Sequence, residues 1–166
     1  MAKAVKLSDN IVLEAKIVSK AFNRSVAGQI EYWAKIGKIG EENPDLTYEF
    51  IKDILVSLQE VEAGKLEAYD FDWELMMNVI QTFTFKRQIK KLHKNKKKEL
   101  DKAIKTVLDN PYVGNMKKGD LGEVQVYKFK MVNQLMLLAY KLYEEKLQLI
   151  LLSLGPHENF YRDLKR

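Results

Sequence analysis

The sequence contains no cysteine, two histidines and three prolines among its 166 residues. The absence of cysteine excludes a disulfide scaffold, a thiol nucleophile and every cysteine-ligated metal site. His93 and His157 are too few for a conventional zinc site, so we expect neither a metal nor another cofactor. No apolar run reaches about 18 residues, so no segment is predicted to span a membrane. The N-terminal residues lack the apolar stretch of a secretory signal, and we expect a cytoplasmic protein.

The formal net charge is only +5, but acidic and basic residues are distributed very unevenly along the chain. Residues 1–39 carry +4, residues 40–76 carry two bases against eleven acids, or −9, and residues 77–166 carry +10. We interpret this pattern as two basic modules that bind polyanions, separated by an acidic segment able to cover one of them. Chance clustering of charges on solvated faces is the alternative.

Alternation predicts a short strand over Lys3–Leu7. Ser8-Asp9-Asn10 then supplies N-cap oxygens to a helix that runs to Phe22. Ser25 caps a second helix, which is predicted to end at Gly37. One short strand has no partner within this block, so we predict a dimer, or a larger assembly, in which two copies pair their strands.

The remaining chain is predicted to be α+β. Residues 44–75 read as mainly helical, because apolar residues recur at helical spacing and acids occupy the other face. The final 90 or so residues read as one compact domain with a strand, two helical segments, an antiparallel meander and a polar tail. Their predicted bounds are a strand over 79–85, a basic helical segment over 86–98, an amphipathic helix over 100–108, and strands over 124–131, 134–140 and 147–154.

Both halves of the chain resemble known families. Ala4-Val5-Lys6-Leu7-Ser8-Asp9 and the run from Arg24 to Gly37 resemble ParD-like ribbon–helix–helix antitoxins. The runs Phe85 to Lys94, Val126 to Lys130 and Leu154 to Lys165 resemble the RelE/ParE toxin superfamily. The resemblance implies a type II antitoxin and its toxin in one polypeptide. The implied parts are a ribbon–helix–helix domain in 1–39, an acidic toxin-neutralising helical segment in 40–76, and a toxin domain in 77–166 that ends in a tail helix.

The ribbon–helix–helix resemblance implies operator DNA as a partner, with paired strands in the major groove. The outward face would present Lys6 to guanine and Ala4 to a thymine methyl. The amides near Ser25, with Arg24 beside them, are predicted to hold a DNA phosphate. A ribbon that only dimerises is the alternative.

The acidic segment (residues 40–76) is predicted to neutralise the basic toxin domain by covering its RNA-facing surface. Tyr69, Phe71 and Trp73 offer apolar anchors for this contact, either within one chain or between the subunits of a dimer. Covalent linkage raises the effective concentration of such a segment to about millimolar. A plain solvated linker is the alternative.

The toxin resemblance implies a metal-independent, ribosome-dependent mRNA endonuclease that attacks through the 2′-OH and leaves a cyclic phosphate. The stretch from Gly155 to Tyr161 is similar to the ending of the YafQ-like branch, which makes His157 catalytic and gives Tyr161 a stacking or proton-transfer role. Lys128 and Lys130 match the paired lysines of RelE. Arg162 would contact phosphate. Histidine serves as acid or base near neutral pH, and fixed cations stabilise developing negative charge.

One position departs from the family pattern. RelE-type toxins carry an arginine on the strand after the paired lysines, and Leu137 stands there instead. Loss of such a cation costs about a hundred- to thousand-fold in rate. Two alternatives therefore stay open, a ParE-like gyrase inhibitor for which His157 is incidental and a transcriptional regulator with a catalytically inactive toxin fold.

Basic residues crowd the stretch from 86 to 98, with eight in 13 positions. This density predicts contact with the backbone of ribosomal RNA or mRNA, weakened steeply by salt. His93 is interpreted as a surface or RNA-docking residue, and a solvated face is the alternative for the whole stretch. The predicted RNA-binding residues are Lys86, Arg87, Lys90, Lys91 and Lys94.

Overall fold

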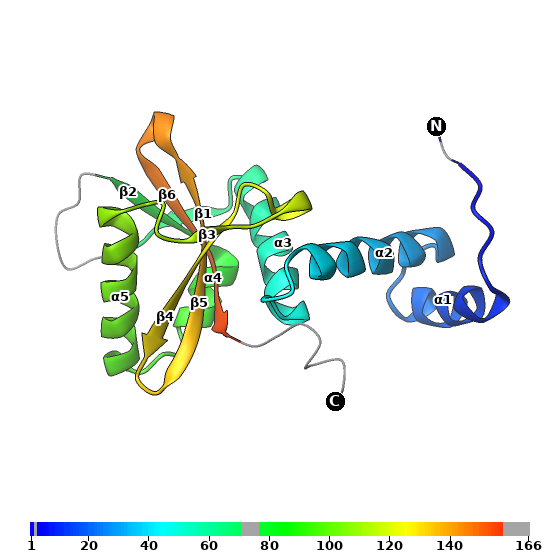
Figure 1. The fold of residues 1–166 in the computed structure, drawn as a ribbon, viewed down its shortest axis with the longest axis horizontal. Helices are drawn as coiled ribbons and strands as arrows, with labels where there is room; N and C mark the ends of the chain where they lie inside the picture. The colour runs from blue at the N-terminus through cyan, green and yellow to red at the C-terminus, as the bar shows by residue number, and fades with distance from the viewer. Residues whose placement is uncertain (2, 71–76, 158–166) are drawn as a thin grey trace. The chain divides into compact units, whose positions relative to one another are not determined.

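The computed structural model describes residues 1, 3–70 and 77–157 (Figure 1). Its Cα positions divide into two compact units, Met1–Lys38 and Ile39–Arg166. Helix α2 (Val26–Glu42) begins in the first unit, and its last turn belongs to the second. The described part of the acidic segment, residues 40–70, therefore shares one compact unit with the strands and helices that follow it.

In the first unit, α1 (Asp9–Ala21) and α2 are joined by a tight turn. Asn23 adopts the left-handed conformation (φ 52°), and the Arg24 amide donates to the Ser19 carbonyl at 2.9 Å, which ends α1 as a Schellman turn. Ser25 Oγ accepts from the Gly28 amide at 3.0 Å. The predicted cap of the second helix by Ser25 is confirmed.

The predicted strand over Lys3–Leu7 is wrong for the single chain, in which residues 3–8 form neither helix nor strand. A strand requires a neighbour to accept and donate its backbone hydrogen bonds. The rest of the described first unit is helical apart from the turn between α1 and α2, so it offers no such neighbour. Ser8 does stand at the N-cap of α1, but its side chain makes no capping hydrogen bond, contrary to prediction.

Helix α2 continues past Gly37, where we predicted its end, and stops at Glu42. Its later turn carries Ile39, which is fully buried. Burial of this side chain outweighs the low helix propensity of glycine. The helix ends one residue before Asn43-Pro44, as the restriction on residues preceding proline requires.

The second unit is a six-stranded sheet in the order β1-β2-β6-β5-β4-β3. Strands β2 and β6 are parallel, and the other neighbouring pairs are antiparallel. The predicted meander is confirmed by β4, β5 and β6, whereas β1 and β3 were not predicted. The strands are β1 (Leu66–Ala68), β2 (Asn78–Thr82), β3 (Asn115–Met116), β4 (Gln125–Met131), β5 (Gln134–Tyr143) and β6 (Gln148–Pro156).

Helices cover both faces of this sheet (Figure 1). Helix α5 (Lys94–Asp109) buries Leu100 and Ile104 in a core shared with Leu154 of β6. Helix α3 (Tyr48–Glu62) lies on the opposite face, because its Phe50 meets Gly155, the neighbour of Leu154, and successive strand residues point to opposite faces. No helix within the described residues is long and apolar enough to cross a bilayer. Short 3₁₀ turns occupy Gly119–Leu121 and Glu144–Lys146.

The region from 79 to 98 differs from prediction at two points. The predicted strand over 79–85 ends at Thr82, whose Oγ1 accepts from the Phe85 amide at 3.2 Å and caps α4 (Phe83–Ile89). The basic segment over 86–98 is not one helix, because α4 ends at Ile89 and α5 begins at Lys94. Ile89 and Leu92 both pack against the apolar core, and the chain turns between the helices to place them there.

Candidate functional site

Two rows of directly paired residues cross the strands at the end of β6. Lys128 pairs with Leu137, which pairs with Gly155, and Lys130 pairs with Leu135. Directly opposed residues point to the same face, as do residues two apart along a strand. Both rows therefore lie on the face that α3 covers at Gly155. Lys128 and Lys130 are exposed there.

His157 extends the second row. Its amide donates to the Leu135 carbonyl at 3.0 Å, which continues the β5–β6 ladder one residue past Pro156. This register places the half-exposed His157 beyond Leu135, in the row of Lys130. The structure thus brings Lys128, Lys130 and His157, which we predicted from separate motifs, to one face of three adjacent strands.

Four predicted site residues lie outside the described part of the chain, and nothing structural is stated of them. They are Tyr161 and Arg162 of the toxin ending, and Phe71 and Trp73 of the acidic segment. The predicted tail helix lies outside the described residues as well.

Leu137 occupies the centre of the first row, where the resemblance to RelE-type toxins implies an arginine. Its side chain is 2% exposed, between Lys128 on one side and Gly155 on the other. The centre of this face is therefore apolar, and its positive charge comes from β4 at the edge.

Helix α3 of the acidic segment packs on this face along β6 and leaves Lys128 and Lys130 of β4 exposed. A β-carbon built on Gly155 would lie 2.7 Å from Cδ2 of Phe50, so the aromatic ring rests directly on the glycine. Ile54, one turn later, is fully buried. Ser57 Oγ then donates to the Leu152 carbonyl at 2.6 Å. One face of α3 thus follows β6 over about two turns of helix, from Gly155 back to Leu152.

Polar contacts tie the beginning of the acidic segment to the loop that precedes β4. The Asn43 side chain accepts from the Lys118 amide at 2.9 Å and donates to its carbonyl at 3.3 Å. Asp45 pairs with Lys117 at 2.7 Å, and the Lys117 side chain is 6% exposed. A buried ammonium without a partner is costly, so Asp45 satisfies a charge that the basic domain could not bury by itself.

The end of α3 and β1 hold helix α4. Glu60 accepts from the amide and the hydroxyl of Thr84 at 2.9 and 3.0 Å. Glu67 of β1 forms an ion pair with Lys86. β1 also adds a strand to the edge of the sheet through its antiparallel pairing with β2. Lys86, predicted to bind RNA, is engaged by the acidic segment.

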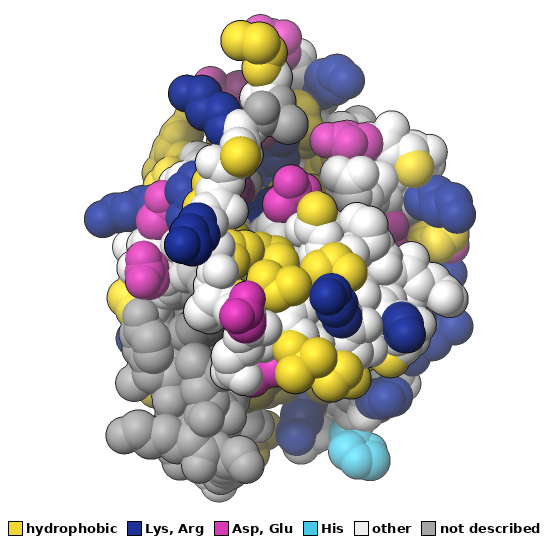
Figure 2. Space-filling model, turned by 90° about the vertical axis from the view of Figure 1, so that its right-hand side faces the viewer, with side chains coloured by type: hydrophobic (Ala, Val, Ile, Leu, Met, Phe, Trp, Pro, Cys, Tyr) yellow, Lys and Arg dark blue, Asp and Glu magenta, His cyan; other side chains and the backbone are white. Residues whose placement is uncertain are grey.

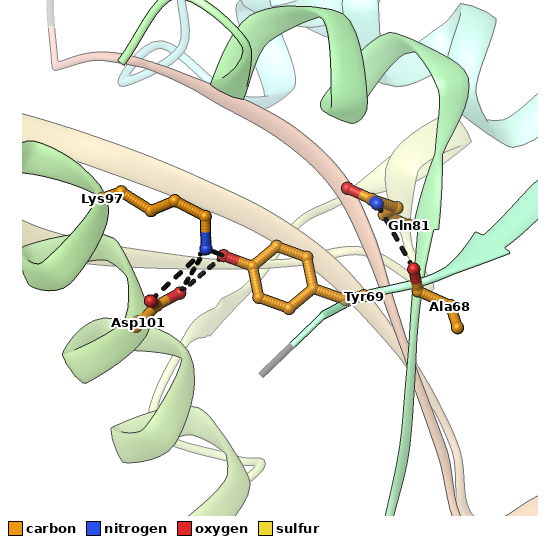
Figure 3. Close-up of polar contacts among 5 residues, drawn as sticks. All are labelled: Ala68, Tyr69, Gln81, Lys97 and Asp101. Atoms are coloured by element: carbon orange, nitrogen blue, oxygen red, sulfur yellow. Dashed lines mark hydrogen bonds and ion pairs between the residues drawn. The ribbon is translucent and has the colours of Figure 1, made fainter. Parts of the chain in front are cut away.

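Tyr69 is the predicted anchor that the structure describes, and it enters the apolar core. Its ring is 6% exposed and meets Phe85 edge-on at 6.1 Å between centroids. Its hydroxyl donates to Asp101 at 2.6 Å, with Lys97 beside both (Figure 3). Burial, and then the Asp101 carboxylate, raise the pKa of Tyr69, which keeps the phenol protonated. Next to it, Gln81 donates to the Ala68 carbonyl at 3.4 Å.

A basic pocket of about 660 Å³ lies where α3, α4 and the end of β6 meet. Of the five predicted RNA-binding residues, Arg87, Lys90 and Lys91 line it, whereas Lys94 belongs to α5. The full lining is Asp53, Thr84, Arg87, Gln88, Lys90, Lys91 and Leu154.

Gln88 organises this pocket. Its Nε2 donates to Asp53 at 3.0 Å, and its Oε1 accepts from the Leu154 amide at 2.8 Å. Gln88 therefore connects the acidic segment to β6, three residues before His157. Burial, and then the charge of Glu49, raise the pKa of Asp53.

In the first unit, the predicted DNA-binding residues Ala4, Lys6, Arg24 and Ser25 are all exposed. The Arg24 guanidinium lies 4.0 Å from the centre of the Tyr32 ring, so its position is set by packing. The Ser25 hydroxyl is used as the helix cap.

Helix α1 and its C-cap residue Phe22 carry large apolar side chains on the surface. Ile17 is 64% exposed and Phe22 is 65% exposed, and Ile11 and Leu13 are exposed as well. Figure 2 shows one face of the molecule on which hydrophobic side chains lie among cationic ones. Such exposed apolar groups favour an interface with another chain.

Sequence reasoning missed the residues through which the acidic segment contacts the sheet and α4. The charge imbalance identified the segment, but single acids at helical spacing carry no sign of their partners. The missed residues are Asn43, Asp45, Phe50, Asp53, Glu60 and Gln88.

Comparisons with known proteins divide the chain between residues 70 and 79, later than the boundary between the two compact units at residues 38 and 39. The family model described as a ParE-like toxin of type II bacterial toxin-antitoxin systems matches residues 79–165. The model described as a ParD-like antitoxin of type II bacterial toxin-antitoxin systems matches residues 2–70. No curated protein matches the sequence. Among solved structures, the isolated E. coli RelE toxin matches with 17% identity and a TM-score of 0.41, over 52% of this chain and 90% of that chain.

Proposed function

Because the chain belongs to the ParE-like toxin family of type II toxin–antitoxin systems and carries a ParD-like antitoxin region before it, we propose that it is a self-inhibited toxin. Its toxin part is an endoribonuclease that cuts mRNA on the ribosome in the cytoplasm. Its antitoxin part inhibits the toxin within the same chain and binds operator DNA.

The observation that carries this proposal is the position of α3. It packs on the sheet face that holds Lys128, Lys130 and His157, with Phe50 seated on Gly155. An RNA strand reaching His157 along this face meets α3. Inhibition therefore requires no change in the toxin fold, only occupation of the face.

The proposed chemistry needs a proton acceptor or donor and fixed positive charge. His157 serves as acid or base toward the 2′-OH or the leaving 5′ oxygen. Lys128 and Lys130 stabilise the negative charge that develops on the phosphorane. The 2′ oxygen forms a bond to phosphorus while the bond to the 5′ oxygen breaks, which leaves a 2′,3′-cyclic phosphate and a 5′-hydroxyl.

The test compares cells that express the full chain with cells that express residues 77–166 alone. Labelled amino-acid incorporation is expected to fall rapidly for residues 77–166 and to stay unchanged for the full chain. His157→Ala in residues 77–166 is expected to abolish the fall, whereas Glu145→Ala, at an exposed position of the 3₁₀ turn before β6, leaves it intact. A toxic full chain contradicts self-inhibition, and a toxic His157→Ala variant contradicts the nuclease.

A second candidate, favoured by Leu137, is a ParE-like gyrase inhibitor or a toxin fold without catalysis. A cation is missing where RelE-type toxins have arginine, and the position is buried. Thymidine incorporation measured beside amino-acid incorporation separates these functions. A primary fall in DNA synthesis indicates gyrase, and no fall in either indicates a regulator.

For the DNA-binding part, we propose that two copies pair residues 3–7 as a ribbon. The exposed apolar side chains of α1 support this arrangement, as does the lack of a strand partner for residues 3–7 within the described part of the first unit. Sedimentation is expected to give a dimer or a larger assembly. Lys6→Ala is expected to weaken binding to the promoter DNA of its own gene, whereas Lys3→Ala, on the opposite face of the ribbon, has the smaller effect.

A further inference from the structure

Helix α3 presents an aromatic ring and a carboxylate one turn apart on the same side. Phe50 rests on Gly155. Asp53 lines the basic pocket and accepts a hydrogen bond from Gln88 at 3.0 Å. Residues three apart on a helix are neighbours on its surface, so the ring and the charge face the toxin together.

The surface beneath them has two matching places. The first is Gly155, which has no side chain and lets a ring approach its backbone, in a row with Leu137 and with Lys128 at the edge. The second is the basic pocket, in which Arg87, Lys90 and Lys91 supply three cations. Asp53 is the one acid among the described residues that line the pocket.

We propose that α3 inhibits the toxin as a mimic of one nucleotide. The Phe50 ring takes the place of a nucleobase on Gly155, and the Asp53 carboxylate takes the place of a backbone phosphate at the basic pocket. Bases in single-stranded RNA bind flat apolar surfaces through their faces, and arginine and lysine bind the neighbouring phosphates. The inference rests on the proposed function, because it takes RNA as the substrate.

The geometry of the pocket indicates that Asp53 opposes the entry of RNA phosphate through its charge and not by filling the space. The pocket of about 660 Å³ stays open beside Asp53, so an anion can still enter it while α3 is docked. An incoming phosphate there meets the carboxylate before it gains the three cations. Charge on Asp53 therefore decides whether the pocket accepts an anion while α3 stays docked through its apolar residues.

The experiment measures binding of a fluorescent 2′-O-methyl RNA oligonucleotide to the full chain by anisotropy at low salt. This probe lacks the nucleophilic 2′-OH, so binding is read without cleavage or ribosomes. Asp53→Asn is expected to tighten binding about tenfold over the wild type, because it removes the competing charge and keeps the side-chain shape. Glu49→Gln removes the same charge from an exposed site on the same helix and is expected to change binding little.

The cations and the ring are tested in the same background. Adding Lys90→Ala and Lys91→Ala to Asp53→Asn is expected to remove the gain. Adding Phe50→Leu, which keeps an apolar side chain over Gly155 but no ring, is expected to tighten binding further. Circular dichroism establishes that each variant is folded.

Equal gains for Asp53→Asn and Glu49→Gln overturn the phosphate half of the proposal, as does a gain that survives loss of both lysines. Binding unchanged by Phe50→Leu overturns the nucleobase half. Failure of the proposed nuclease gives a different result. In that case residues 77–166 leave translation intact, but Asp53→Asn still binds the RNA probe more tightly than the wild type does.

Discussion

The carboxylate of Glu60 accepts two hydrogen bonds from Thr84, one from the backbone amide at 2.9 Å and one from the hydroxyl at 3.0 Å. Glu60 belongs to the antitoxin region, and Thr84 lies in the first turn of toxin helix α4. Thr84 is 4% exposed, so water does not readily replace these bonds. The first amides of a helix have no partner within it, and the antitoxin supplies one.

Glu60→Ala is expected to lower the free energy of unfolding by about 1–3 kcal/mol, because both buried donors of Thr84 lose their acceptor. Urea unfolding of the full chain measures this loss. Glu62→Ala, at an exposed position of the same helix, serves as the control and is expected to cost less than about 0.5 kcal/mol. Equal losses for the two variants would show that Glu60 does not cap α4.

Gly155→Ala is expected to destabilise the docking of α3, because the new methyl lies 2.7 Å from Phe50 Cδ2. Overpacking of this kind costs about 1–3 kcal/mol. Gly37→Ala is the matched control, since a β-carbon there meets nothing within 4 Å and the position is helical. The control is expected to gain about 0.5–1 kcal/mol. A Gly155→Ala protein as stable as the wild type to urea contradicts close seating of the ring.

Tyr69→Phe is expected to cost about 1–2 kcal/mol of stability, because the variant keeps the buried ring and loses the hydrogen bond to Asp101. Tyr112→Phe removes a hydroxyl from a side chain that is 61% exposed and is expected to be nearly neutral. Thermal unfolding of both variants checks the difference. A neutral Tyr69→Phe means that the hydroxyl adds nothing to the apolar anchor.

The pH dependence of stability is expected to report on Asp53. Burial and Glu49 raise its pKa in the folded state, against the opposing effects of Gln88, Lys52 and Arg87; Lys90 and Lys91 line the same pocket. The folded protein therefore binds this proton more tightly than the unfolded chain, whose value is near 3.8. The contribution of this proton to the stability of the folded protein is fully present below pH 3.8. It is lost as the pH rises through the pKa of Asp53 in the folded state.

Asp53→Asn cannot ionise and does not suffer that loss. The free energy of unfolding of this variant, relative to that of the wild type, is expected to increase as the pH rises from about 3.8. Above the folded pKa of Asp53 the difference is expected to stay constant. Urea unfolding between pH 3 and 7 tests this. Val56→Ala removes no titratable group from the same helix and is expected to give an offset independent of pH. A difference between Asp53→Asn and the wild type that decreases with rising pH would contradict a raised pKa of Asp53.

Local pattern predicted much of the secondary structure. Strand-like runs in the sequence predicted the meander of β4, β5 and β6 within a few residues, and helical spacing predicted α3 and α5. Predictions failed where tertiary contacts outweighed local preference. Helix α2 passes Gly37 because Ile39 is buried, and the basic segment breaks at residues 90–93 because Ile89 and Leu92 both reach the core.

The two-family composition and the separation of charge into three blocks are properties of the sequence by itself. Which acid meets which base is a property of the tertiary structure, since contacts such as that of Asp45 with Lys117 join residues far apart in the chain. The same holds for the shared face of Lys128, Lys130 and His157, because strand register sets it. Register and helix docking depend on the summed burial of many side chains, and no short motif encodes that sum.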